Sequence, residues 1–209
     1  MSQTANRRTG MTLFSDKDEL YSHIVRIVLA EKGVAHDLVL VKPEQVPEDV
    51  YEVNPYGSLP TLIDRELSVF KAPIINEYLD ERFPHPPLMP VYPVARANTR
   101  LMMYRIEQDW FSLAKKILSH SDDAAVARRD LREGLLAMAP LFQENTFFLS
   151  DEFSLVDCYL AALLWRLPAM GIELSGAGSK ALNLYMGRIF ERDGFQQSLT
   201  SAEREIRRG

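Results

Sequence analysis

The sequence predicts an α/β domain followed by an all-helical domain, and three observations support this prediction. Short apolar runs alternate with helical patterns only in the first part of the chain, whereas later segments have helical spacing throughout. Between the two parts lies RFPHPPLMPVYP, residues 82–93, whose five prolines exclude a helix or a central strand. We expect domains at 11–86 and 94–208, an interdomain loop at 87–93 and a flexible tail at 1–10.

The first domain has the pattern of a four-stranded mixed sheet with helices packed on it. A helix over 19–33 is expected to end at Gly33, and a second helix over 72–83 begins with Pro73, where the missing N–H costs nothing. This βαβ–ββα order is typical of thioredoxin-like domains. The expected strands are 11–14, 36–41, 58–63 and 67–70.

The second domain is expected to contain five helices. Ser154 is placed to cap the third of them, with Asp157 at the third helical position. Thr200 and Glu203 have the spacing of a capping box at the start of the last helix. The expected ranges are 95–120, 122–142, 153–167, 179–192 and 200–208.

Composition and charge exclude several classes of protein. The 209 residues include one cysteine and no apolar run of membrane-spanning length, which favours a cytoplasmic protein without membrane association. Residues 11–86 have a net charge of −7, and residues 87–209 have a net charge of 0. An acidic first half does not favour nucleic-acid binding, because phosphate backbones require clustered Lys and Arg. The four histidines lack metal-ligand spacing. We therefore expect no metal, no cofactor and no direct nucleic-acid binding.

The proline-rich segment has the composition of a docking surface. Its backbone is fixed by proline and loses little entropy on binding, and its aromatic side chains offer large contact areas. The alternative is a rigid joint whose residues pack the domain junction. Phe83 and Leu88 are the residues that best fit this alternative.

Several segments resemble a known superfamily, the glutathione transferases. These are VRIVLAEKGV at 25–34, the Leu-Pro of GSLPTLID at 57–64, and FSLVDCYLA at 153–161. YLDERFPHPPLMPVYPVARANTR at 78–100 and FLSDEFSLVDCYLAALLWRLP at 148–168 resemble one branch more closely. That branch is the stringent starvation protein A family of bacterial RNA polymerase-associated proteins, and the resemblance covers essentially the whole chain.

The resemblance implies a function and a site. It implies a homodimeric, non-catalytic regulator of the stringent starvation and stationary-phase response, bound to RNA polymerase holoenzyme near its sigma factor. In the resembled family this loop forms a surface pocket, and the residues matching Pro84, His85 and Tyr92 are needed for transcription activation. With Pro86 and Pro87, these are the expected partner-binding residues.

The resemblance also locates a glutathione site whose catalytic position is changed. Glu19 stands where the superfamily has a catalytic serine, and its carboxylate would repel a thiolate about 4 Å away by roughly 4 kcal/mol at an effective dielectric constant near 20. Cys158 is expected to be a buried structural thiol within an apolar helix. The alternative is a glutathione-dependent transferase or reductase that uses Ser22 or Tyr21.

The anchoring positions of the same site differ as well. In the superfamily the proline matching Pro60 is cis and the backbone next to it, at Leu59, binds the cysteinyl part of glutathione. A Glu-Ser pair at the start of the third helix binds the γ-glutamyl end, and Lys71 and Ala72 stand there in this sequence. We therefore expect a degenerate glutathione site and no transferase activity.

Overall fold

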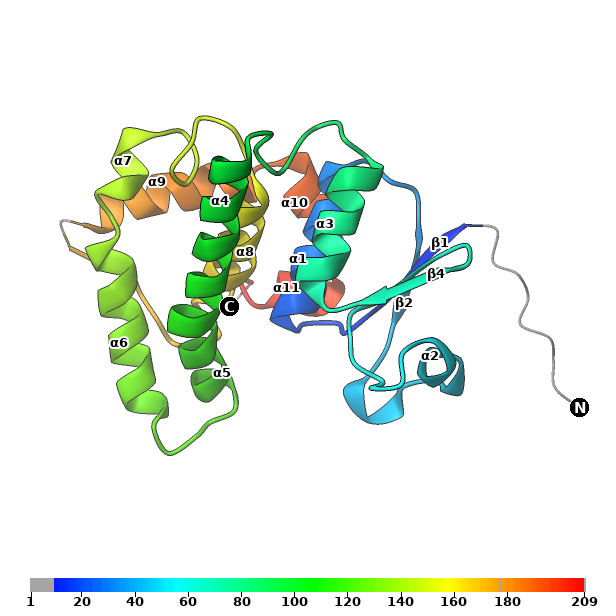
Figure 1. The fold of residues 1–209 in the computed structure, drawn as a ribbon. Coiled ribbons are helices and arrows are strands. Elements are labelled where there is room, and N and C mark those ends of the chain that lie inside the picture. Colours follow the sequence, from blue (N-terminus) through cyan, green and yellow to red (C-terminus); the bar gives the residue numbers. More distant parts are fainter. Residues whose placement is uncertain (1–9, 177, 209) are drawn as a thin grey trace, which may run out of the picture.

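The computed structural model describes residues 10–176 and 178–208, and it places a sheet-containing part beside a helical part (Figure 1). All of the tail expected at 1–10 except Gly10 lies outside the described residues. The strands are β1 Met11–Ser15, β2 Asp37–Leu40, β3 Thr61–Asp64 and β4 Leu67–Phe70.

The sheet is mixed, as the sequence predicts, with strand order β2-β1-β3-β4. β1 runs parallel to β2 and antiparallel to β3, and β3 is antiparallel to β4. Helices α1, Leu20–Glu31, and α3, Ala72–Arg82, pack against one another. Leu13, Ile24 and Leu79 belong to the large core that joins the sheet to these helices.

β3 begins at Thr61, three residues later than predicted. The Asn54 side chain donates hydrogen bonds to the Ser58 carbonyl oxygen (3.0 Å) and to Thr61 Oγ1 (2.8 Å), which holds the preceding residues in a turn. Pro60 has no N–H to give to a strand ladder. Two further elements, the 3₁₀ turn Pro43–Gln45 and α2 Glu48–Val53, were not predicted; α2 contributes Val50 to a small second core.

The helical part differs from the prediction mainly in its interruptions. The helix expected over 95–120 contains a π-helical segment, and the helix expected over 122–142 is divided before Pro140. The predicted helix over 200–208 is shorter, and α10 was not predicted. The elements are α4 Pro93–Ile106, the π-helical segment Glu107–Phe111, α5 Ser112–Leu118, α6 Ala124–Ala137, α7 Leu141–Glu144, α8 Leu155–Trp165, α9 Ser179–Phe190, α10 Asp193–Ser198 and α11 Ser201–Glu205.

Both predicted capping boxes are confirmed. Ser154 and Asp157 cap α8, and Thr200 and Glu203 cap α11. All eleven residues of α8 are buried, so this helix forms the centre of the molecule. α10 and α11 return from the helical part and lie beside α1 (Figure 1).

A buried network of charged side chains holds α11 against α1 and the end of α8. The Glu203 carboxylate accepts hydrogen bonds from Arg26 Nη2 (2.6 Å) and Arg166 Nη2 (2.5 Å), and both arginine side chains are buried. Arg166 Nη1 donates to His23 Nδ1 (2.8 Å), so His23 carries its proton on Nε2 and donates it to Ser198 Oγ (3.1 Å). Burial, Arg166 and Arg26 lower the pKa of His23 well below its ordinary value. The network therefore joins α1, α8 and α11 with a neutral histidine.

Candidate functional site

The proline loop, residues 82–93, is held from beneath by a buried lysine. Lys32 Nζ, at the end of α1, donates to Asp80 Oδ1 (2.7 Å) and to the carbonyl oxygens of Phe83 (2.7 Å) and Pro86 (2.5 Å). The Lys32 side chain is fully buried. Carbonyl groups that are shielded from water need hydrogen-bond donors, and proline has no backbone N–H to donate. The Lys32 ammonium group therefore supplies the donors that the proline loop lacks.

The far end of the loop is fixed in the same way. Asp80 Oδ1 accepts a hydrogen bond from the Leu88 amide (2.7 Å), and the Leu88 carbonyl accepts one from the Leu155 amide (2.8 Å). Helices α1, α3 and α8 thus each supply one attachment. The His85–Pro86 bond is cis. The Lys32–Asp80 pair could not be predicted from local sequence patterns, because the two residues are 48 positions apart.

Side chains of the proline loop divide into exposed and buried sets. Tyr92 is 77% exposed. Leu88 is buried and Phe83 half-buried, as expected for residues that pack the junction. Met89 is also buried. The other exposed residues among those expected to bind a partner are Pro84, His85, Pro86 and Pro87.

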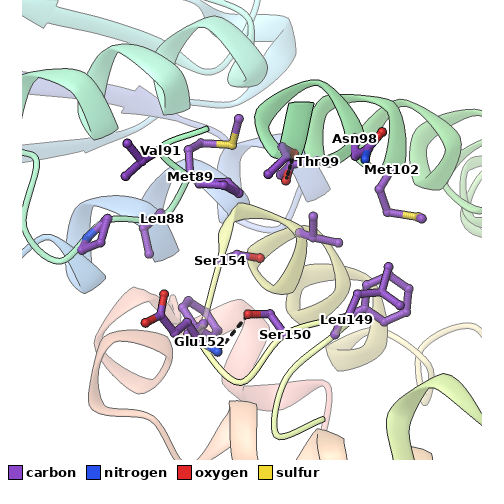
Figure 2. A pocket seen from close by; sticks show the side chains of 16 residues that line it. Leu88, Met89, Val91, Asn98, Thr99, Met102, Leu149, Ser150, Glu152 and Ser154 are labelled. Carbon is purple, nitrogen blue, oxygen red and sulfur yellow. Dashed lines mark hydrogen bonds between the residues drawn. The ribbon is translucent and has the colours of Figure 1, made fainter. Parts of the chain in front are cut away.

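An apolar cavity of about 540 Å³ adjoins the second half of the loop (Figure 2). Leu88, Met89 and Val91 form one wall, α4 forms another, and residues 148–156 form the third. Of the five residues expected to bind a partner, Pro87 lines this cavity; the other four lie outside its walls.

The sequence analysis did not identify residues 148–156, the third wall, as part of a site. Asp157 Oδ1 accepts hydrogen bonds from the Phe148 amide (2.9 Å) and the Tyr185 hydroxyl (2.7 Å). Its other oxygen accepts from the Ser154 amide (2.9 Å). Burial raises the pKa of Asp157, while these donors oppose the shift. The capping residue of α8 therefore also positions the segment that closes the cavity, a role that depends on long-range contacts.

Glu19, which the resemblance sets at the superfamily's catalytic position, is the N-cap of α1. Its Oε1 accepts from the Tyr21 amide (2.9 Å) and its Oε2 from the Ser22 amide (2.8 Å). Burial raises the pKa of Glu19, and the two amide donors oppose this shift. The carboxylate thus occupies the donors that a bound anion would use at this helix end.

The two hydroxyls considered as substitutes have other surroundings. Ser22 is fully buried, and its Oγ accepts a hydrogen bond from the Asp16 amide (3.1 Å). Tyr21 is half-buried; burial, together with Glu107 and Glu19, raises the pKa of Tyr21 to about 12. The two charged groups that act on the phenol, Glu107 and Glu19, are both acidic, and negative charge there opposes a thiolate.

Lys71 and Ala72 lie at the start of α3. Lys71 is exposed and is the N-cap with φ +72°, a backbone conformation that costs energy in a residue with a side chain. Within the described residues its side chain makes no capping hydrogen bond. Ala72 is buried and has no hydroxyl. The Leu59–Pro60 bond is cis, as the resemblance implies.

Other candidate groups have structural surroundings. Cys158 is fully buried, and burial raises the pKa of its thiol. Arg128 Nε donates to the Met170 carbonyl (2.6 Å), and Arg132 Nε donates to the Glu173 carbonyl (3.1 Å), so these arginines hold a loop. Within the described ranges, no group of three His, Cys, Asp or Glu side chains is arranged to hold a metal ion. Over the same ranges, no helix has the length and apolar character needed to cross a membrane.

Comparison with known proteins agrees with this geometry. The glutathione S-transferase N-terminal domain family matches residues 9–81, and the C-terminal domain family matches residues 101–193. The two domains in this order define a chain of the glutathione transferase fold. A Tau class glutathione S-transferase from mango, Mangifera indica, has the same fold, with a TM-score of 0.82 at 20% identity over 95% of this chain and 96% of that one.

Curated relatives identify the branch. A stringent starvation protein A homolog of Pasteurella multocida is 60% identical over 95% of this chain and 94% of its own length. A homolog of the same name from Haemophilus influenzae is 54% identical over 97% of this chain and 96% of its own length. The chain belongs to the stringent starvation protein A family.

Proposed function

We propose that this protein is a non-catalytic regulator of transcription that binds RNA polymerase holoenzyme, near its sigma factor, through the proline loop. The observation that carries the proposal is the loop itself: exposed side chains on a backbone that three helices fix from beneath. A surface held in one conformation loses little entropy on binding. The loop would present Pro84, His85, Pro86, Pro87 and Tyr92 to the partner.

The absence of catalysis is part of this proposal. Glu19 places a carboxylate where a transferase needs a hydroxyl donor, and the Lys71–Ala72 pair lacks both the acid and the hydroxyl that grip glutathione. No cofactor is then needed. The competing function is a glutathione-dependent transferase or reductase, which retention on immobilised glutathione together with a conjugation assay would reveal.

We also propose a homodimer, built from domains 11–86 and 94–208 joined by 87–93. Ile74 on α3, and Leu101 and Tyr104 on α4, are all more than half exposed, which leaves apolar surface for a second copy to cover. Two arginines of α4 form ion pairs within the chain. Arg100 pairs with Glu77 (2.6 Å) and Arg96 with Glu81 (3.5 Å).

Contact with polymerase would occur in the cytoplasm and would not require direct binding to nucleic acid. Measuring DNA binding by a mobility-shift assay at physiological salt tests the second point. The acidic first domain argues against such binding, since phosphate contacts require clustered Lys and Arg.

The decisive experiment replaces Pro84, His85 and Tyr92 together by alanine. We expect the dimer and its melting temperature to stay nearly unchanged while co-purification with RNA polymerase is lost. Val126→Ala, which shortens an exposed apolar side chain on α6, is the matched control and should retain polymerase. A triple variant that is monomeric or unfolded would show that the loop is structural, and one that still binds polymerase would overturn the proposal.

A further inference from the structure

The edge of the sheet formed by β2 is a second surface, and in the part of the chain that the structure describes no further strand pairs with it. Within the described residues, β2 pairs with β1 alone. The Val41 amide donates to the Ser15 carbonyl (2.8 Å), so the backbone groups of alternate residues 37, 39 and 41 face β1. The N–H and C=O groups of Leu38 and Leu40 therefore point along the free edge, where such a row is a template for another strand.

A cavity of about 520 Å³ lies beside this edge. Its walls are Leu38 and Leu40 of β2, the end of α1 and the residues that follow it, and residues 197–201, which run from the end of α10 to the start of α11. Leu38 is 42% exposed and Leu40 is 51% exposed, and the two side chains share one face because strand side chains alternate. Val39 turns to the other face, against the second core. The edge thus combines outward-facing backbone hydrogen-bonding groups with an apolar cavity lined by Leu38 and Leu40.

The strand lacks three of the features that protect a free edge, although it is short, with four residues, and begins with Asp37. Edge strands are commonly blocked by lysine, proline or a bulge, and Asp37–Leu40 contains neither of these residues and pairs in regular register. Arg26, the charged residue in the cavity wall, is already paired with Glu203. The segment 36–53, which contains β2 and the residues that follow it, has one lysine and five acidic residues, and all five acids are exposed. A complementary occupant is apolar where it meets the strand and basic beside it.

We propose that β2 binds an extended segment of a partner protein as an added strand. The segment carries apolar side chains at alternate positions, which sit on Leu38 and Leu40, and basic residues at its flank, which face the acidic residues of 36–53. Backbone pairing supplies the affinity, and the cavity supplies the selectivity for alternate side chains. This surface is separate from the proline loop, so its occupancy does not depend on the function proposed above.

Selection from random twelve-residue peptides displayed on phage, with the full-length protein as the target, tests this proposal. Selected peptides are synthesised, and their affinity for the protein is measured by fluorescence anisotropy. We expect alternating apolar residues with a basic flank. Leu40→Pro removes one outward N–H without touching the ladder to β1, and it should weaken binding at least tenfold at an unchanged melting temperature. Val126→Ala is the control and should bind as the wild type does.

A second arm needs no protein variant and covers the case in which Leu40→Pro misfolds. N-methylation of alternate peptide amides should abolish binding in one register and leave it intact in the other, which is the signature of strand pairing. Failure to recover such peptides, equal binding by Leu40→Pro, or loss of binding in both registers would each overturn the proposal. So would assembly of the wild type through this edge into a larger oligomer that Leu40→Pro reverses, because the edge would then serve a second copy.

Discussion

Replacing Lys32 by methionine would remove the cation that holds the proline loop. The substitution keeps a long apolar stem in the buried space but deletes the ammonium group. Asp80 would remain buried and charged with the Leu88 amide as its donor, and the carbonyl groups of Phe83 and Pro86 would lose theirs. The loop would then lose both hydrogen bonds to Lys32 but keep those of Leu88 with Asp80 and Leu155.

The expected cost follows from the burial of both partners. The Lys32 side chain is fully buried and that of Asp80 is 7% exposed. Removing one member of such a pair typically costs about 3–5 kcal/mol, because the other charge stays buried without compensation. This is a large share of a domain's stability, which is commonly about 5–15 kcal/mol. Adding Asp80→Asn neutralises the remaining charge but keeps an acceptor for Leu88, and should restore about 1–3 kcal/mol.

Urea unfolding followed by the fluorescence of Trp110 and Trp165 measures the free energies of unfolding. Arg105→Met is the control, since it breaks an exposed pair with Asp109 and should cost under about 0.5 kcal/mol. Hydrogen exchange at the Leu88 amide reports the loop directly, and it should accelerate in Lys32→Met. Polymerase binding should weaken as well, although a buried lysine cannot touch a partner.

Two results would refute this reasoning. A Lys32→Met variant within about 1 kcal/mol of the wild type would show that the buried pair contributes little net stability, as some buried pairs do. Unchanged exchange at Leu88 with reduced stability would show that the lysine stabilises the fold without fixing the loop.

Three further predictions concern other parts of the molecule. Because the pKa of His23 is lowered, the unfolded chain binds a proton below its ordinary pKa of 6.5 that the folded chain does not, so stability should fall by up to about 1.4 kcal/mol per pH unit below that point. His23→Gln should flatten this dependence in urea titrations; an unchanged slope would assign it to other groups. Lys71→Glu with Ala72→Ser should increase retention on immobilised glutathione without conjugation, since Glu19 still occupies the amides of α1, and turnover above the uncatalysed rate would contradict this. Cys158 should react with a thiol reagent only as fast as the protein unfolds, and rapid reaction of the native protein would show that the thiol is accessible.

The parts of the fold that local chemistry determines could be predicted from the sequence. The mixed sheet and both capping boxes depend on alternation, turn residues and side chains three positions apart, all of which are visible within short windows. The π-helical segment within 95–120 could not be predicted in this way, because its residues keep helical spacing on either side. The prediction of a single helix over 122–142 was wrong near Pro140, although a proline within a helical pattern is a recognisable helix breaker.

The candidate site could likewise be predicted only where its residues have a local sequence pattern. Its proline composition is visible in the sequence, and so are Glu19, Lys71 and Ala72 at the positions that the resemblance assigns to a glutathione site. Lys32 and residues 148–156 could not be found, since neither has a local signature and each acts through contacts across the fold. A lysine directly before Gly33 looks like an ordinary helix end, and only the packing of α1 against α3 turns it inward.

Glu203 lies 177 residues after Arg26, and this separation affects how the chain matures during synthesis. While the ribosome is still translating the helical part, Arg26 in α1 and Arg166 at the end of α8 have been synthesised, but Glu203, their counter-ion, has not. Burying an unpaired guanidinium is costly, so the side chains of Arg26 and Arg166 should stay hydrated until α11 supplies Glu203. Nascent chains should therefore stay open, and available to chaperones, until residue 203 has emerged from the exit tunnel.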